Sequence, residues 1–261
     1  MPRFKLTIEY AGTRYSGWQI QKNARTVAGE IERAVSDAAR RREFELYGAG
    51  RTDSGVHALA QIAHLELYTD LPSETLRTRV NDALPADIYV RSIDKVPHRF
   101  HARHDAVSRS YLYQISRRKT AFFKPYVWWI KEPLDLARMR EAARAFIGMQ
   151  NFASFTADEP SEKSTKVLVE RLEIGEDGDL ILIRIVGSHF LWRMVRRIVG
   201  VLAAIGRGEL SADRAAGFLD ERSELPATLT APASGLFLEG VYYRGDDGPG
   251  RLRAVLSVPA P

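Results

Sequence analysis

The order of apolar periodicities along the first hundred residues is the feature that most constrains the fold. Polar and apolar residues alternate through residues 3–10, which predicts a half-buried strand. Thr26 then precedes an apolar stripe at helical spacing, which predicts a capped helix. The predicted elements are a strand at 3–10, a helix at 26–38, strands at 44–47 and 59–67, a helix at 73–84 and a strand at 87–96. This order is typical of the split β-α-β arrangement of ferredoxin-like domains.

The rest of the chain has a similar mixture of strands and helices. Its predicted elements are a strand at 110–116, an irregular crossover at 122–133, helices at 134–148, 190–206 and 212–219, a hairpin of strands at 167–174 and 180–186, and a strand at 236–243. We therefore expect an α+β protein with two ferredoxin-like halves, one over residues 1–105 and the other over residues 106–261. Their antiparallel sheets are expected to join across a basic central cleft that holds the functional site.

Composition excludes several classes of protein. The 261 residues include no cysteine, which excludes disulfides, thiolate zinc sites and a cysteine nucleophile. No apolar run is long enough to span a bilayer and the first residues do not resemble a signal peptide, so we expect a cytoplasmic protein with no membrane partner. The net charge of +5 favours a polyanionic partner. Basic clusters at 40–42, at 117–119 and at Arg193, Arg196 and Arg197 fit phosphate contacts, although a solvated face explains any one of them alone.

The segment from Gly48 to Ala58 presents a single carboxylate, Asp53, in a loop with three glycines between two predicted strands. Glycine permits backbone angles and close approaches that a side chain forbids, so this loop can present Asp53 to a large molecule. The alternative is a structural turn in which the Asp side chain bonds to its own backbone. A lone carboxylate serves as a nucleophile, a base or a metal ligand, and the loop alone does not choose among these roles.

Histidines at three-residue spacing, His98, His101 and His104, are the one arrangement that suggests a metal ion. Arginines at 99, 103 and 109 surround them and disfavour a cation, so surface or RNA-facing histidines are the preferred interpretation and no metal is expected. The chain also lacks GxGxxG, Walker A and serine-elbow motifs, so no nucleotide cofactor is expected. This basic segment ends at Tyr111, a strand residue that fits either packing or stacking on a nucleobase.

The predicted helix over 190–206 carries a second charged group. At helical spacing Arg193, Arg196 and Arg197 share one face, and the apolar residues lie opposite. The group is either an exposed basic face or a partner for a carboxylate, since an adjacent opposite charge favours the ionised form.

Taken together, five segments resemble the tRNA pseudouridine synthase A family over essentially the whole chain. They are YAGTRYSGWQ at 10–19, TVAGE at 26–30, GRTDSGVHA at 50–58, FLWRMVRRIVG at 190–200 and APASGL at 231–236. This chain departs from the family pattern at three positions. It has Ala28 where the pattern has Gln, Ser54 where the pattern has Ala, and Arg197 where the pattern has Asn. These departures are adjacent to the residues that the family uses, not at them.

The resemblance implies an enzyme that converts uridine to pseudouridine around positions 38 to 40 of the tRNA anticodon stem-loop, as a homodimer and with no cofactor or metal. Asp53 is implied to be the essential aspartate, Arg196 its partner and Tyr111 the residue against the target base. Leu236 is implied to form an apolar wall, and Arg51 to flip or hold the target nucleotide. The remaining candidate RNA contacts are His57, Arg103, Arg109, Arg193 and Arg197.

Two other functions fit part of the sequence. A non-catalytic RNA-binding protein uses the basic clusters and aromatic residues. In such a protein Asp53 has no catalytic role and forms only a structural ion pair with Arg51 and Arg196. An aspartic protease shares the triplet Asp53-Ser54-Gly55. A bilobal protease needs a second copy of that triplet, which the chain lacks, and the retroviral type has fewer helices.

Overall fold

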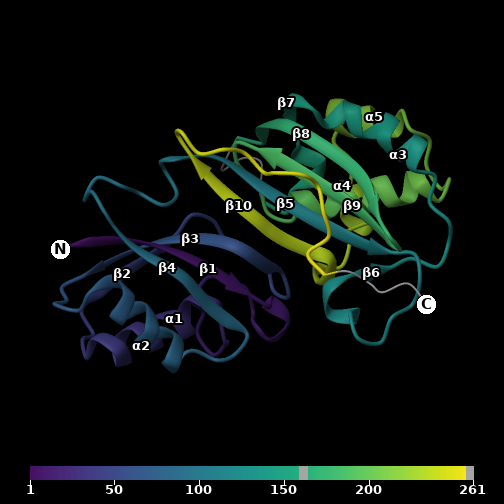
Figure 1. Cartoon of the computed structure of the whole chain (residues 1–261). Helices are drawn as coiled ribbons and strands as arrows, with labels where there is room; N and C mark the ends of the chain where they lie inside the picture. The colour runs from purple at the N-terminus through teal and green to yellow at the C-terminus, as the bar shows by residue number, and fades with distance from the viewer. Residues whose placement is uncertain (159–163, 257–261) are drawn as a thin grey trace. The chain divides into compact units, whose positions relative to one another are not determined.

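The computed structural model describes residues 1–158 and 164–256, and the chain divides into two compact units (Figure 1). The first unit comprises Met1–Val107 and Phe237–Gly248, and the second comprises Ser108–Leu236 and Pro249–Pro261. The predicted boundary at residue 106 puts the whole of the later chain in one half. Strand β10 (Leu236–Tyr243) departs from that division, because Phe237 and Leu238 pair in parallel with His57 and Ala58 of the first unit.

The first unit is built on strands in the order β4-β1-β3-β2, and all of these pairs are antiparallel. Its elements are β1 (Arg3–Tyr10), α1 (Val27–Ala39), β2 (Phe44–Gly48), β3 (His57–Leu67), α2 (Ser73–Ala83) and β4 (Ile88–Val96). Both helices cover the same face of this sheet (Figure 1). Every second residue of β1, from Phe4 to Tyr10, is buried, as its alternating sequence predicts. The predicted split β-α-β arrangement is confirmed here.

Local chemistry fixes the ends of helix α1. The Thr26 hydroxyl accepts the backbone N–H of Gly29 at 3.3 Å, which satisfies one of the unpaired donors at the helix start. Arg40 takes a left-handed conformation and ends the helix. The predicted apolar stripe from Val27 to Ala38 is buried.

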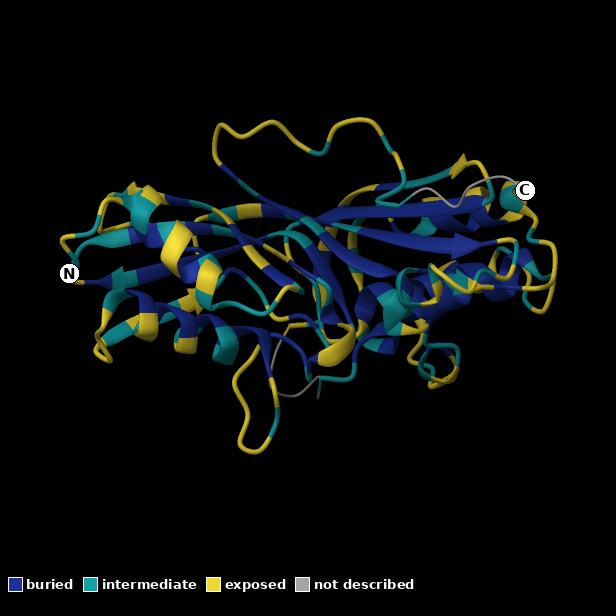
Figure 2. Ribbon diagram, turned by 60° about the horizontal axis from the view of Figure 1, so that its bottom comes forward, coloured by how far each residue is buried: buried dark blue, intermediate teal, exposed yellow. Residues whose placement is uncertain are grey.

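The second unit has the sheet order β5-β9-β8-β7, and the short strand β6 pairs in parallel with β5. Its strands are β5 (Ala106–Ser116), β6 (Trp128–Trp129), β7 (Gly148–Asn151), β8 (Lys166–Asp177) and β9 (Leu180–Gly187), and its helices are α3 (Leu136–Ala143), α4 (Met194–Gly206), α5 (Arg214–Asp220) and α6 (Leu225–Thr228). All residues of β9 are buried, and so is nearly all of α4. Figure 2 shows the long strands mostly in dark blue, with exposed residues in yellow on loops and on parts of the helices. The α+β class and its mostly antiparallel pairing are confirmed.

Some predicted boundaries in this unit are wrong. The helix expected from Phe190 begins only at Met194, because Arg193 has a φ of 63° and a left-handed residue cannot continue a right-handed helix. The helix expected over 134–148 ends at Ala143 and continues as a short 3-10 turn before β7. The sequence analysis did not identify β6, β7 or α6, which are four residues or shorter.

A buried arginine ties the C-terminal segment to the second unit. Arg184 of β9 is 1% exposed, and its guanidinium donates to the backbone carbonyls of Gly250 at 2.9 Å and Arg251 at 3.3 Å. It also forms an ion pair with Glu173 at 3.3 Å. Further along, the Val255 N–H donates to the Gln114 side chain at 2.7 Å. We call residues 249–256 the C-terminal strap.

The strap also covers apolar surface. Leu252, Ala254 and Val255 pack against a buried cluster that includes Leu112 and Leu182. The Leu252 side chain packs closely over Gly175, since a Cβ there would lie 2.8 Å from it and would require Leu252 to shift. Buried charge and apolar packing therefore act together to hold the strap.

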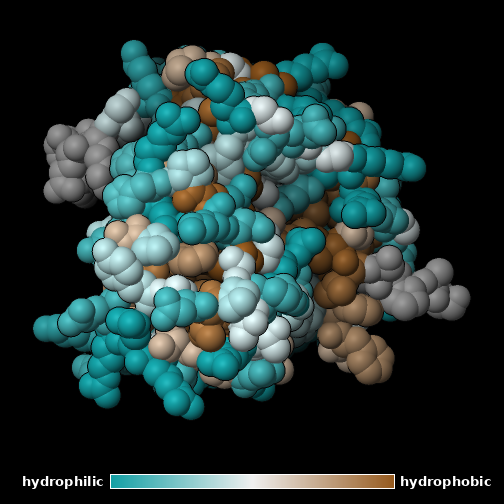
Figure 3. Space-filling view, turned by 60° about the vertical axis from the view of Figure 1, so that its left-hand side comes forward, coloured by the Kyte–Doolittle hydropathy of each residue, from teal (hydrophilic) through white to brown (hydrophobic). Residues whose placement is uncertain are grey.

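The surface in view in Figure 3 is mostly covered by hydrophilic side chains, with hydrophobic residues in patches between them. Phe122, at 87% exposed, is the most exposed of the large hydrophobic residues in the part of the chain that the structure describes. None of the helices in that part has the length and apolar character that a membrane crossing requires.

Candidate active site

The loop that carries Asp53 joins β2 to β3 in the first unit, as predicted. Asp53 is half-buried, and its carbonyl accepts the N–H of Val56 at 3.2 Å, which closes a turn. The preceding residue, Thr52, is buried, and its hydroxyl bonds to the Tyr10 hydroxyl at 2.8 Å. Burial raises the pKa of Tyr10 well above its usual value, so this phenol stays neutral. The Asp53 loop is therefore attached to the core of the unit on one side of the carboxylate.

The glycine-rich segment 11–18 supports the same loop from the other side. The Trp18 N–H donates to the Thr52 carbonyl at 3.1 Å, and the Gly55 N–H donates to the Tyr15 carbonyl at 3.3 Å. The Ser54 hydroxyl also donates to the Tyr15 carbonyl, at 3.2 Å, a bond that the alanine of the family pattern cannot make. We call residues 11–18 the cradle, since they hold Thr52, Ser54 and Gly55 on either side of Asp53.

Two glycines make this close packing possible. A Cβ at Gly12 would lie 1.9 Å from the Val56 carbonyl oxygen, so no other residue fits there. Gly17 has a φ of +95°, and a Cβ there would lie 2.5 Å from the Thr52 carbonyl oxygen. The cradle and the Asp53 loop thus approach each other backbone to backbone.

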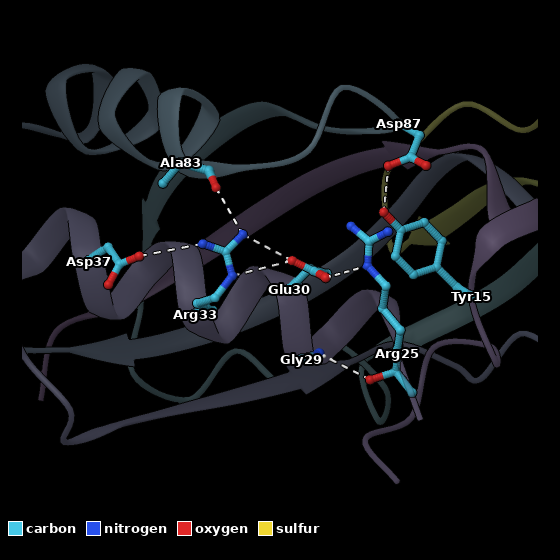
Figure 4. Close-up of polar contacts among 9 residues, drawn as sticks. Tyr15, Arg25, Gly29, Glu30, Arg33, Asp37, Ala83 and Asp87 are labelled. Carbon is cyan, nitrogen blue, oxygen red and sulfur yellow. Dashed lines mark hydrogen bonds and ion pairs between the residues drawn. The ribbon is translucent and has the colours of Figure 1, made fainter. Parts of the chain in front are cut away.

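The cradle is itself fixed by a polar network (Figure 4). Tyr15 donates its hydroxyl to Asp87, and the Arg25 guanidinium lies 5.0 Å from the centre of the Tyr15 ring. Glu30 of α1 accepts from Arg25 and from Arg33, and Arg33 reaches the Ala83 carbonyl at the end of α2 at 3.1 Å. Burial and the bond to Asp87 raise the pKa of Tyr15, which keeps it a hydrogen-bond donor. The sequence analysis did not identify Tyr15, whose role depends on a contact across 39 residues.

Replacing Gly17 tests whether the cradle is as tight as these distances indicate. Gly17→Ala is expected to lower the free energy of unfolding by about 2–3 kcal/mol, because it adds both backbone strain and a clash with Thr52. Urea unfolding measures the loss. Gly50→Ala, in the Asp53 loop that the cradle supports, is the matched control, since nothing lies within 4 Å of a Cβ there. Equal losses of unfolding free energy in the two variants would show that the cradle is not tightly packed.

His57 follows the Asp53 loop and is 1% exposed. Its Nδ1 accepts the Gly12 N–H at 3.0 Å, and its ring stacks on Phe237 at 4.8 Å. These contacts make His57 part of the support for the cradle, and they correct its prediction as an RNA contact.

A row of imidazoles lies on the same unit. The rings of His64 and His101 are 4.6 Å apart, those of His101 and His104 are 4.2 Å apart, and Tyr47 stacks on His64 at 5.3 Å. Backbone N–H groups donate to the Nδ1 atoms of His64 and His101. Among residues 1–158 and 164–256, no three His, Asp or Glu side chains are arranged to hold a metal ion.

The imidazole row predicts a loss of stability at acid pH. Burial, aided by the charges of His101 and Arg3 and opposed by Glu66 and Asp105, lowers the pKa of His64 from 6.5 to about 4. Between pH 6.5 and pH 4 the unfolded chain binds a proton at His64 that the folded protein does not bind. The contribution of neutral His64 to the free energy of unfolding is therefore complete above pH 6.5 and is lost as the pH falls toward 4.

The expected loss from His64 is about 2–3 kcal/mol between pH 7 and pH 4. Urea unfolding at a series of pH values measures it, and His64→Gln, which has no titrating group, is expected to show a shallower decline. Parallel declines in the two proteins would contradict the assignment to His64.

Three other predicted site residues lie in the second unit. Tyr111 of β5 is half-buried, with its ring edge against Phe190 at 5.1 Å. Arg196 is in the first turn of α4, where its Nε donates to the Ala231 carbonyl at 2.8 Å and its own carbonyl accepts the Ala231 N–H at 3.0 Å. The segment from Ala231 leads directly to Leu236, which is 4% exposed.

Tyr113 connects these residues and was not identified from the sequence. It is buried two residues after Tyr111, on the same side of β5, and its hydroxyl donates to the Pro232 carbonyl at 2.8 Å. Burial raises the pKa of Tyr113 well above its usual value, and the nearby charge of Arg196 opposes that rise. The alternation of β5 is the signal that places it beside Tyr111.

The three arginines of the 190–200 segment do not share one helix face, contrary to the prediction from their spacing, and they do not form an exposed basic face. Arg193 precedes α4 and is exposed, Arg196 is half-buried, and Arg197 is 8% exposed. The Arg197 guanidinium donates to the carbonyls of Ser154, at 3.2 Å, and Thr156. Burial, together with the charge of Arg193, lowers the pKa of Arg197. Arg197 is thus part of the interior of this unit and not an RNA contact.

The other predicted arginines lie at the surface or near it. Arg51 and Arg103 are exposed in the first unit. Arg109 of β5 is half-buried and donates to the Ser188 carbonyl at 2.7 Å. In the 117–119 cluster, Arg117 and Arg118 form ion pairs with Glu176 and Asp179, which reduces the positive charge of that cluster.

Most of the chain matches a known protein family. A family profile described as tRNA pseudouridine synthase matches residues 6–105 and 142–244. In a solved Cbf5–Nop10–Gar1 complex, a chain with 10% identity aligns at a TM-score of 0.36, covering 76% of this chain and 54% of that one.

Two curated relatives match over nearly the whole length. The tRNA pseudouridine synthase A of Pseudothermotoga lettingae is 38% identical over 246 residues, covering 93% of this chain and 100% of the relative. The protein of the same name from Thermoanaerobacter sp. (strain X514) is 39% identical over 245 residues, covering 93% and 100%. The chain therefore belongs to the tRNA pseudouridine synthase A family.

Proposed function

We propose that this protein isomerises uridine to pseudouridine in tRNA, with Asp53 as the essential group. The observation that carries the proposal is the support of the Asp53 loop. Thr52, Ser54 and Gly55 are each bonded to residues of the cradle or of β1, and this support is set by two positions where only glycine fits. A loop held this firmly keeps the backbone of Asp53 in place, which is what a catalytic group needs, since such groups must keep their geometry.

The reaction rearranges one glycosidic bond. The N1–C1′ bond of uridine breaks, the uracil turns, and a C5–C1′ bond forms. The proton on C5 is then lost and N1 takes up a proton, so the product is an isomer of the substrate. No net oxidation occurs, and no other molecule enters the overall equation.

In this proposal an ionised Asp53 begins the reaction. Three routes are open to it: attack at the sugar C1′, attack at the base C6, or assistance to elimination. Arg196 is proposed as the partner of this carboxylate, as the family resemblance implies. Tyr111 lies against the target base and takes the C5 proton in the last step.

The remaining residues hold the substrate. Leu236 gives an apolar wall that keeps the detached uracil from exchanging with water. Arg51 holds the flipped nucleotide, whose extrusion from its stack costs a few kcal/mol. Arg103, Arg109 and Arg193 contribute phosphate contacts that offset this cost. His57 and Arg197 are left out, since their polar groups bond inside the fold.

The structure of the second unit supports the role of Arg196. The side chain and the backbone of Arg196 both form hydrogen bonds with Ala231. These two bonds attach the segment leading to Leu236 to the first turn of α4. The Tyr113 bond to Pro232 attaches the same segment to β5, two residues from Tyr111. Arg196, Tyr111 and Leu236 are therefore held in fixed relation within this unit.

We further propose that the target lies at positions 38 to 40 of the anticodon stem-loop and that the protein acts as a homodimer. Transcripts that keep a single uridine at position 38, 39 or 40 test the first point. Pseudouridine mapping is expected to show product at these positions and none at uridines elsewhere in the tRNA. Product only outside this stem would overturn the position, and sedimentation of a monomer at working concentration would overturn the dimer.

A further inference from the structure

An exposed aromatic residue and an exposed arginine stand side by side where helix α4 begins. Trp192 is 50% exposed, and the Arg193 guanidinium lies 5.0 Å from the centre of its ring. Half of the indole is thus accessible even with a cation over it. The mechanism above gives Trp192 no role.

The backbone of Trp192 is held from two directions. Its N–H donates to the Asp158 carboxylate at 3.1 Å, and its carbonyl accepts the Ala157 N–H at 3.1 Å. The Asp158 carboxylate is in turn fixed by Thr156, whose hydroxyl bonds to it at 3.1 Å. These bonds fix the position of the Trp192 backbone, and a fixed backbone is the support that a binding side chain needs.

Buried Arg197 completes this anchoring. Its guanidinium donates to the carbonyls of Ser154 and Thr156, so it holds the segment that carries Asp158. The chain of contacts runs from Arg197 through Thr156 and Asp158 to Trp192. An asparagine, as in the family pattern, is too short to replace the two-carbonyl contact without a shift of the segment.

The backbone of Arg193 is strained. Its φ of 63° is disfavoured for a residue with a Cβ, and only three non-glycine residues of the described chain have a positive φ. Such strain persists where the surroundings over-determine it, and it is concentrated at functional sites. A glycine at this position would relieve the strain, so the arginine is present at a cost to the fold.

We propose that Trp192 and Arg193 form a subsite for one unpaired nucleotide of the tRNA substrate, with the base stacked on the indole and its phosphate on the guanidinium. RNA is the occupant that fits the chemistry. Indole and guanidinium groups together are typical of single-stranded RNA binding, and Arg196 adds positive charge one turn further along α4. The subsite rests on the proposed function, because it binds the same substrate.

Four variants test the subsite. Trp192→Ala removes the stacking surface and Trp192→Phe keeps an aromatic ring. Arg193→Gly removes the phosphate contact and relieves the backbone strain. Trp129→Leu is the matched control, because Trp129 is 41% exposed in the same unit and also has a lysine, Lys119, 5.6 Å from its ring centre.

The measurements are tRNA affinity by filter binding and steady-state and single-turnover formation of pseudouridine. Trp192→Ala is expected to raise Kd and KM about 10-fold, with a smaller effect on the single-turnover rate at saturating tRNA. Trp192→Phe is expected to remain within about threefold of the wild-type protein. Arg193→Gly is expected to raise Kd and to reduce the slope of log Kd against log salt concentration by about one. Its thermal unfolding midpoint is expected to stay the same or to rise, because the backbone strain is relieved.

Three results would overturn the subsite while leaving the proposed function intact. The first is an active Trp192→Ala protein with wild-type Kd and KM. The second is an equal loss in Trp129→Leu, which would indicate a general effect of exposed indoles. The third is a change of oligomeric state in Trp192→Ala that accounts for its loss, which would make this surface a protein interface. A wild-type protein that forms no pseudouridine would instead contradict the proposed function itself.

Discussion

An Asp53→Asn protein is expected to bind tRNA with nearly wild-type affinity and to form pseudouridine at least about 10⁴-fold more slowly. The amide keeps the shape of the carboxylate but has neither its charge nor its nucleophilicity, and all three routes open to Asp53 need the ionised group. Single-turnover assays with enzyme in excess measure the rate, and filter binding measures the affinity.

The support of the loop makes this variant a clean test of chemistry. The bonds of the cradle reach Thr52, Ser54 and Gly55, so the loop retains its neighbours when the Asp53 side chain changes. Ser54→Ala is the control in the same loop. Its rate of pseudouridine formation is expected to fall by less than about 10-fold, because the substitution removes one neutral hydrogen bond. An active Asp53→Asn protein would contradict the assignment, and so would a Ser54→Ala protein that is equally inactive while folded.

The second large effect concerns stability and the C-terminal strap. A chain that ends at Gly248 is expected to lose about 3–5 kcal/mol of unfolding free energy, since the buried Arg184 cation would lose the carbonyls of Gly250 and Arg251. It would also expose the apolar cluster that Leu252 and Val255 cover. Urea unfolding is the measurement, with a chain that ends at Leu256 as the control.

A double-mutant cycle separates the two causes. In an Arg184→Met background no buried cation loses its carbonyl partners, so removal of the strap is expected to cost less than it does in the wild-type protein. Equal costs in both backgrounds would show that Arg184 does not hold the strap and that apolar packing alone accounts for the loss.

The sequence predicted most strands and helices because their signals are local. The alternation of β1 and the Thr26 cap of α1 are each contained in a few neighbouring residues. Strand β7 and helix α6 were missed because four residues are too few to show a period. The start of α4 was misplaced because the left-handed turn at Arg193 accompanies bonds from Trp192 to residues more than 30 positions earlier.

The candidate site was predicted only in part for a similar reason. The motif around Asp53 is continuous and identifies the loop, whereas the support from Tyr15 and the placement of Tyr113 depend on distant contacts. His57 and Arg197 were predicted as RNA contacts from residue type, and burial assigns both to the interior. Charge and aromatic character alone do not reveal which side of the backbone is buried.

Tritium release from tRNA labelled at uridine C5 tests the central claim most directly, since forming the C5–C1′ bond must expel the hydrogen from C5. The account predicts stoichiometric release by the wild-type protein from the anticodon stem-loop and none by Asp53→Asn. Binding of several tRNAs by the wild-type protein with no release would contradict it, and would make this chain an RNA-binding protein without the isomerase activity.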